Sequence, residues 1–113
     1  MVAQTFVVAM PPSTNNLYVN VPRKGRVKSG VYKRWLTEAG WQLKPQIRHR
    51  YSGDTAVWLT LGPRKKRDLD NCAKAVLDLL QAHHVVLDDL DVVDLRIRWG
   101  DVDGCQIDIE RAA

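Results

Sequence analysis

The apolar positions of this chain follow two kinds of spacing, which together predict four strands and two helices. Residues 2–9 and 55–62 are runs of β-branched and apolar side chains with prolines shortly after them, which is typical of strands. Residues 92–99 and 105–110 predict two further strands, joined by a turn at residues 101–104.

Apolar residues at helical spacing predict one helix over about residues 31–49 and a second over about residues 71–83. Ser29 is the expected N-cap of the first helix, and Pro45 is expected to kink or end that helix. Asp70 is the expected N-cap of the second helix.

The predicted order is therefore β-α-β-α-β-β, in a single α/β domain (residues 1–113) with helices packed on a mixed sheet. No apolar run is long enough to span a membrane, and residues 2–9 are expected to be a strand and not a signal peptide. Cys72 and Cys105 lack metal-ligand spacing, and two such thiols are typical of a cytoplasmic protein. No organic cofactor is expected.

Residues 17–28 follow neither spacing and are expected to form a basic loop or a loose hairpin. The cations of this segment surround Gly25 and are Arg23, Lys24, Arg26 and Lys28. Contact with DNA and exposure to solvent are both open for these four side chains.

The net charge of +4 hides a division of the chain into a basic and an acidic part. Residues 1–67 carry 13 Lys and Arg against two acids, a net charge of +11. Residues 68–113 carry four Lys and Arg against 11 acids, a net charge of −7. This asymmetry favours a basic binding surface beside an acidic site, although a fold that interleaves the two parts is the alternative.

The boundary between these parts places four cations directly before two carboxylates. The cations are Arg64, Lys65, Lys66 and Arg67, and such side chains bind phosphate. Asp68 and Asp70 follow at i and i+2, so both point the same way in an extended segment. Two such carboxylates suit Mg²⁺, which takes hard oxygen ligands and keeps several waters. The alternative is a solvated loop followed by carboxylates that cap a helix and compensate its dipole.

Two further features belong to the same hypothesis. Asp88 and Asp89, with Asp91 and Asp94 beyond them, form a second acidic cluster that is able to complete a metal site, although alone it is typical of a polar turn. Lys74 lies one turn after Asp70, where its ammonium group is able to neutralise charge that develops on a phosphate.

These motifs resemble the RusA family of Holliday junction resolvases, small magnesium-dependent endodeoxyribonucleases that are common in phages and prophages and act in DNA recombination and repair. The resemblance covers most of the chain. The residues that carry it are Pro11-Pro12-Ser13, Asn15-Asn16, Tyr18, Arg67-Asp68-Leu69-Asp70-Asn71, Lys74, Leu87-Asp88-Asp89 and Val92-Val93-Asp94.

The resemblance implies that Asp68, Asp70 and Asp89 bind the catalytic metal, which is Mg²⁺ with Mn²⁺ as a substitute, and that Lys74 takes part in catalysis. It also implies a symmetric homodimer that cuts four-way junction DNA by paired nicks. A dimer of this kind presents two identical sites to a junction that itself has two-fold character. His84 is a departure, because the family often has glycine just after the second helix.

Two other functions remain open from the sequence. The chain is alternatively a non-catalytic module that binds DNA junctions, with binding indifferent to magnesium. It is alternatively a metal-dependent nuclease that acts on other branched or single-stranded nucleic acid.

Overall fold

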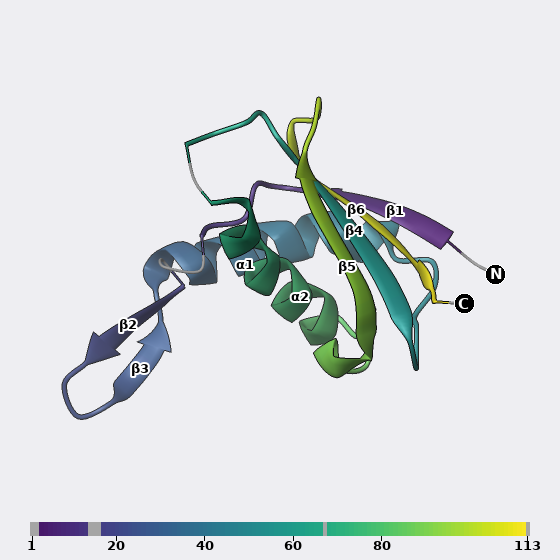
Figure 1. Ribbon diagram of the computed structural model, residues 1–113. Helices are drawn as coiled ribbons and strands as arrows, with labels where there is room; N and C mark the ends of the chain where they lie inside the picture. Colours follow the sequence, from purple (N-terminus) through teal and green to yellow (C-terminus); the bar gives the residue numbers. More distant parts are fainter. Residues whose placement is uncertain (1–2, 14–16, 67, 113) are drawn as a thin grey trace.

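A four-stranded mixed sheet with two helices on one side forms the body of the protein (Figure 1). The computed structural model describes residues 3–13, 17–66 and 68–112. The strand order is β1-β6-β4-β5, and the strands are β1 (Ala3–Val8), β4 (Thr55–Gly62), β5 (Val92–Trp99) and β6 (Gly104–Arg111). β6 pairs antiparallel with both β1 and β4, whereas β4 and β5 are parallel.

Helix α1 (Gly30–Leu43) begins where the sequence predicts, because the Tyr32 backbone N–H donates to the Ser29 side-chain oxygen at 3.1 Å. The helix ends at Leu43, and a 3₁₀ turn, η2 (Lys44–Gln46), contains Pro45. The expected end of the helix at this proline is confirmed, and the longer extent to residue 49 is wrong.

Helix α2 (Ala73–Ala82) begins later than predicted, because a 3₁₀ turn, η3 (Leu69–Cys72), precedes it. Asp70 therefore lies inside this turn and is not an N-cap, which corrects the prediction from the sequence. The N-cap position of η3 belongs to Asp68, whose backbone oxygen accepts from the Asn71 N–H at 3.3 Å. Neither carboxylate is therefore needed as a helix cap.

Residues 17–28 form a hairpin of β2 (Tyr18–Val21) and β3 (Gly25–Lys28) that projects away from the sheet and the helices (Figure 1). The observed order is therefore β-β-β-α-β-α-β-β, with two strands more than expected. Arg23 and Gly25 in the turn have φ values of 69° and 74°, a left-handed conformation that glycine adopts readily.

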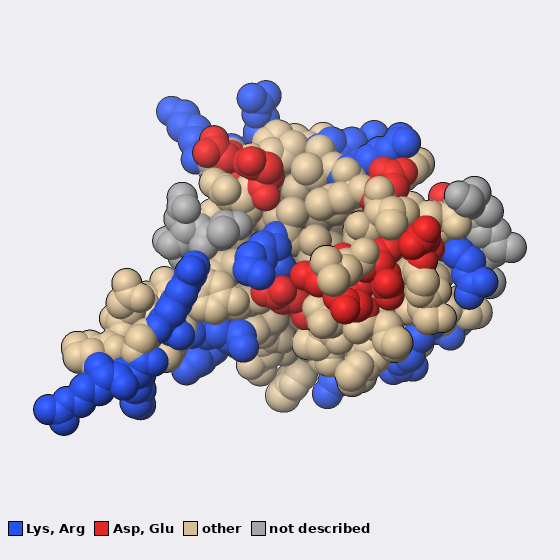
Figure 2. Space-filling model, turned by 60° about the horizontal axis from the view of Figure 1, so that its bottom comes forward, with Lys and Arg blue, Asp and Glu red and all other residues tan. Residues whose placement is uncertain are grey.

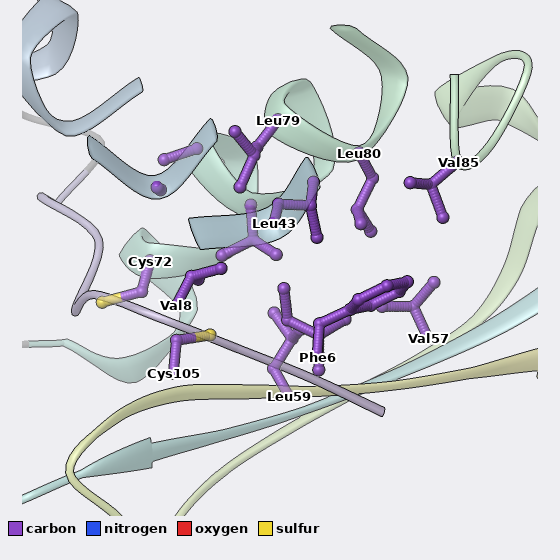
Figure 3. Close-up of a cluster of buried hydrophobic side chains, with 14 of the residues drawn as sticks. Phe6, Val8, Leu43, Val57, Leu59, Cys72, Leu79, Leu80, Val85 and Cys105 are labelled. Atoms are coloured by element: carbon purple, nitrogen blue, oxygen red, sulfur yellow. The ribbon is translucent and has the colours of Figure 1, made fainter. Parts of the chain in front are cut away.

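The core lies between the helices and the inner face of the sheet (Figure 3). Its largest side chains include Phe6, Leu43, Leu59 and Leu80, each at most 1% exposed. Cys72 and Cys105 lie side by side in this core, and burial raises the pKa of the Cys105 thiol to about 12. In the part of the chain that the structure describes, no helix is long and apolar enough to cross a membrane.

The exit from α2 accommodates His84, the residue at which the sequence departs from the resemblance described above. His84 has a φ of 58°, the left-handed conformation in which glycine is most comfortable. The backbone there still closes the helix, since the Val85 N–H donates to the Leu80 carbonyl at 2.9 Å. The departure at His84 thus leaves a normal helix exit before the second acidic cluster.

Candidate active site

Two of the predicted metal ligands, Asp68 and Asp70, flank the first residue of η3 and are both exposed. Asp68 is in an extended conformation, with φ −70° and ψ 126°, and its side chain makes no capping hydrogen bond. Mg²⁺ usually takes one or two carboxylates and fills its octahedron with water and substrate phosphate oxygens. The donor set at η3 therefore fits a magnesium ion.

The basic segment leads directly into these carboxylates. Arg64, Lys65 and Lys66 are exposed in the loop that follows β4, and Arg67 lies outside the described residues. The three described cations line a pocket of about 470 Å³ together with Trp99, which ends β5. The pocket ends at Lys66, two residues before Asp68 along the chain, and its three cations carry the charge that attracts phosphate.

Lys74 lies in the first turn of α2, and its ammonium group has a defined neighbour. The Lys74 Nζ atom lies 3.6 Å from Oδ1 of Asp78, one turn later in the helix. The other oxygen of Asp78, Oδ2, accepts a hydrogen bond of 2.7 Å from the Tyr32 hydroxyl on α1. Burial raises the pKa of Tyr32 far above its ordinary value, with the Asp78 hydrogen bond as a further cause, so this hydroxyl stays protonated.

The sequence places Asp78 on the polar face of α2 with Lys74 but gives it no role. The spacing of i and i+4 from Lys74 is a signal for the pair. No signal in the sequence identifies Tyr32 as the third member, because it is 46 residues from Asp78 and looks like any core aromatic residue.

The second acidic cluster lies at η4 (Asp89–Asp91), before β5. Asp88 is the N-cap of this turn, and its Oδ1 accepts from the Leu90 N–H at 3.0 Å. Asp89 is exposed, and Asp94 pairs with Arg96 at 3.5 Å. Asp88 thus caps a polar turn, as the alternative reading of the sequence predicted, whereas Asp94 pairs with an arginine on its own strand.

The two acidic clusters lie at opposite ends of α2. The helix runs back beside the parallel strands, so η3 follows the C-terminal end of β4 and η4 precedes the N-terminal end of β5. Ten helical residues rise about 15 Å. Among the described residues of this one chain, no three His, Cys, Asp or Glu side chains are placed to hold a metal ion. A single chain therefore does not bring Asp89 to Asp68 and Asp70.

The remaining predicted DNA contacts lie on the hairpin. Its four cations, Arg23, Lys24, Arg26 and Lys28, are exposed, and the Arg26 guanidinium lies 4.6 Å from the centre of the Tyr18 ring. Figure 2 shows Lys and Arg side chains along this projection, and acidic side chains in more than one group on the body of the molecule. The hairpin and the basic segment are thus two separate cationic elements.

Comparison with known proteins fits this arrangement. The sequence model of the family described as endodeoxyribonuclease RusA matches residues 9–110. The chain belongs to the RusA family. The crossover junction endodeoxyribonuclease RusA of Aquifex aeolicus (strain VF5) is 28% identical over 90 residues, which cover 76% of this chain and 71% of the relative. As a member of the RusA family, the chain is an endodeoxyribonuclease, which hydrolyses phosphodiester bonds within DNA.

Proposed function

We propose that this RusA-family nuclease is a homodimer that resolves four-way DNA junctions with Mg²⁺, by one nick in each of two strands. The observation that carries the proposal is the pair of exposed carboxylates at η3, which do not serve as helix caps and which directly follow a run of cations. The family match and the name of the relative from Aquifex aeolicus support the reaction and the junction substrate.

Each element of the site has a role in this proposal. The basic segment and the hairpin bind the DNA backbone, so recognition depends mainly on the shape of the junction. Asp68 and Asp70 hold the metal, which when bound polarises the scissile phosphate and lowers the pKa of a coordinated water. Lys74 donates to the phosphate oxygens as negative charge develops on them.

The separation of the acidic clusters supports a dimer in which each site uses both chains. We propose that Asp89 of the partner subunit joins Asp68 and Asp70. β5 ends the sheet, and its outer edge has no partner strand among the described residues. Exposed apolar side chains occur on β5 and in the segment just before it, at Leu87, Leu90, Val93 and Leu95. An unpaired apolar edge of this kind is a template for pairing with another strand.

Antiparallel pairing of two β5 strands about Leu95 is self-complementary. In that register Asp94 faces Arg96 of the partner subunit, and Val93 faces Ile97 of the partner subunit. The start of each β5, where Asp89 lies, then approaches the end of the other β5. Because η3 contacts β5 in the same chain, this pairing shortens the distance between the two acidic clusters.

The function is tested with a synthetic four-way junction, a flap and a single strand, each incubated with Mg²⁺ and with a chelator. We expect symmetric nicks in the junction with Mg²⁺ alone. Intact junction beside a cut flap or single strand would show a nuclease for other branched or single-stranded DNA. Binding without any cut in the three substrates would contradict the proposed reaction.

The metal assignment predicts a specific effect of Asp70→Asn. The variant removes one charge and one good metal ligand from an exposed position, so we expect junction binding to be retained and cleavage to fall by at least about 100-fold. Gel-shift and cleavage assays on the same preparation measure both. Asp54→Asn is the matched control, since Asp54 is exposed and uses its backbone oxygen, not its carboxylate, to accept from Ala112. Normal cleavage by Asp70→Asn would remove Asp70 from the metal site.

A further inference from the structure

We propose that Asp78, held by the buried hydroxyl of Tyr32, is a positioning residue that orients Lys74 toward the scissile phosphate. The inference rests on the proposed function, in which Lys74 acts at that phosphate. Asp78 belongs to neither acidic cluster, and it is the neighbour of Lys74 on the polar face of α2.

The two oxygens of Asp78 have different partners. Oδ2 accepts from the Tyr32 hydroxyl at 2.7 Å, and Oδ1 lies 3.6 Å from Lys74 Nζ. A hydrogen bond to a charged group contributes about 1.5–3 kcal/mol, so the tyrosine restrains the rotation of the carboxylate. Oδ1 is thereby fixed on the side of the helix where Lys74 lies.

The Tyr32 side chain is a rigid support for this contact. Tyr32 is fully buried, and its ring stacks with Trp35 at 6.5 Å and meets the edge of Tyr18 at 5.9 Å. These contacts belong to the ring and not to the hydroxyl. The position of the hydroxyl is therefore set by the core and by the base of the hairpin, independently of Asp78.

The stability of α2 does not account for a charged residue at position 78. Lysine four residues before an acid is the weaker orientation of a helical ion pair, and such pairs contribute only about 0.2–0.5 kcal/mol. The Asp78 side chain is only 26% exposed, and partial burial disfavours a charge. A neutral amide oxygen would also accept from the tyrosine, in a weaker hydrogen bond, so the hydroxyl alone does not require a charge at this position. The negative charge is explained by the ammonium group that it faces.

The distance to Lys74 suits an orienting contact. Charge-assisted N–H···O bonds are about 2.7–2.9 Å long, so 3.6 Å is close enough for attraction and too long for a full hydrogen bond. The Lys74 side chain is 49% exposed. Its ammonium group has three donors, which remain available to a phosphate oxygen while Asp78 narrows the range of side-chain conformations.

The rival explanation is that Asp78 and Tyr32 serve only to join α1 to α2. A tether of this kind would affect the stability of the protein and leave the chemical step unchanged. A positioning residue would affect the cleavage rate of the bound junction and leave binding unchanged.

The test compares Asp78→Asn, Tyr32→Phe and the matched control Glu38→Gln, an exposed acid on α1. We expect Asp78→Asn to lower the single-turnover cleavage rate at saturating protein by about 10-fold to 100-fold, as small misplacements of a reacting group do. Junction affinity should not weaken, because the change removes a negative charge. Tyr32→Phe should lower the rate less, since the carboxylate stays beside Lys74, and Glu38→Gln should match the wild type.

Two further measurements separate positioning from tethering. Combined with Lys74→Ala, the Asp78→Asn change should cause no additional loss of rate, because it acts only through the lysine. The NMR signal of the Lys74 ε-carbon should shift in Asp78→Asn and not in Glu38→Gln. An additional loss of rate in the double variant, or an unmoved Lys74 signal, would overturn the inference.

The outcomes also distinguish this inference from the proposed function. Junction left intact by the wild-type protein would overturn the proposed function. Normal cleavage by a folded Asp78→Asn variant, with the wild type and Glu38→Gln cutting equally, would overturn only the positioning role. If Asp78→Asn does not fold, Tyr32→Phe carries the test, and a wild-type rate in that variant would then overturn the inference.

Discussion

Gly62 shows how a single residue position connects the sheet to the site. It ends β4, with Pro63 between it and the basic segment, and a Cβ atom there would collide with the backbone oxygens of Val102 and Gly100, the latter at 2.6 Å. Both oxygens belong to the connection between β5 and β6, which is backbone that cannot rotate away. The close approach therefore fixes the point at which the chain leaves the sheet after β4.

Gly62→Ala is expected to destabilise the protein by about 1–3 kcal/mol, because the added methyl group has to displace backbone. Urea unfolding measures the change. Gly30→Ala is the control: its Cβ meets only the end of the Arg34 side chain at 3.3 Å, and alanine favours a helix by up to about 1 kcal/mol. Equal stability of Gly62→Ala and the wild type would show that the connection between β5 and β6 moves aside at little energetic cost.

At the residue scale, the sequence predicts the contacts of a side chain when its partner is close along the chain. The cap at Ser29 follows from its place before a helical pattern and is confirmed. The prediction of Asp70 as a cap is wrong because a 3₁₀ turn precedes α2, and the spacing of apolar residues does not predict this turn. The contact between Tyr32 and Asp78 depends on how α1 packs against α2, and spacing within either helix does not reveal it.

Two elements, the basic segment and the hairpin, present cations to DNA in the proposed complex. Their charges act through phosphate contacts, each of which releases condensed counterions when it forms. Lys65→Ala combined with Lys66→Ala should therefore weaken junction binding and lower the slope of log affinity against log salt by about one unit per cation.

Fluorescence anisotropy of a labelled junction over a range of salt concentrations measures this slope. Arg48→Ala combined with Arg50→Ala removes the same charge from exposed positions in the connection before β4 and should leave the slope unchanged. Equal slopes for both double variants would mean that the basic segment does not contact phosphate.

The four strands of the sheet and the two helices were predictable because each has a clear apolar spacing, while their arrangement was not. β6 comes last in the sequence and yet lies between β1 and β4. That position depends on pairing across about a hundred residues. The sequence did not decide whether residues 17–28 form a loop or a hairpin. The strands of the hairpin contain mostly exposed residues, so apolar and polar side chains do not alternate along them as they do in a half-buried strand.

For the whole molecule, the proposed sharing of each site between two chains predicts that inactive variants restore each other. Asp70→Asn and Asp89→Asn should each be inactive as homodimers. In a mixed dimer one site carries both changes, and the other combines unchanged Asp68 and Asp70 with unchanged Asp89 of the partner subunit. Mixing the two variants after partial unfolding should therefore recover junction nicking up to about one quarter of the wild-type level. With random pairing, about half of the dimers are mixed, and each mixed dimer has one intact site out of two.

Sedimentation at the same concentrations establishes whether mixed dimers are present. Mixed dimers without any recovered cleavage would mean that the three acids do not meet across two chains. The sequence alone does not distinguish one chain from two here. The family resemblance predicts that the three acids bind one metal, whereas the distance that α2 puts between η3 and η4 is known only from the fold.

The two thiols of the molecule have a consequence for its chemistry outside catalysis. Oxidants and alkylating agents react with the thiolate, and a pKa of about 12 keeps Cys105 almost wholly in the thiol form at neutral pH. Cys72 lies two residues after Asp70, where an added oxygen or adduct would force η3 open, yet it too is buried. The folded nuclease should therefore tolerate peroxide without damage to η3, the turn that carries the two proposed metal ligands Asp68 and Asp70.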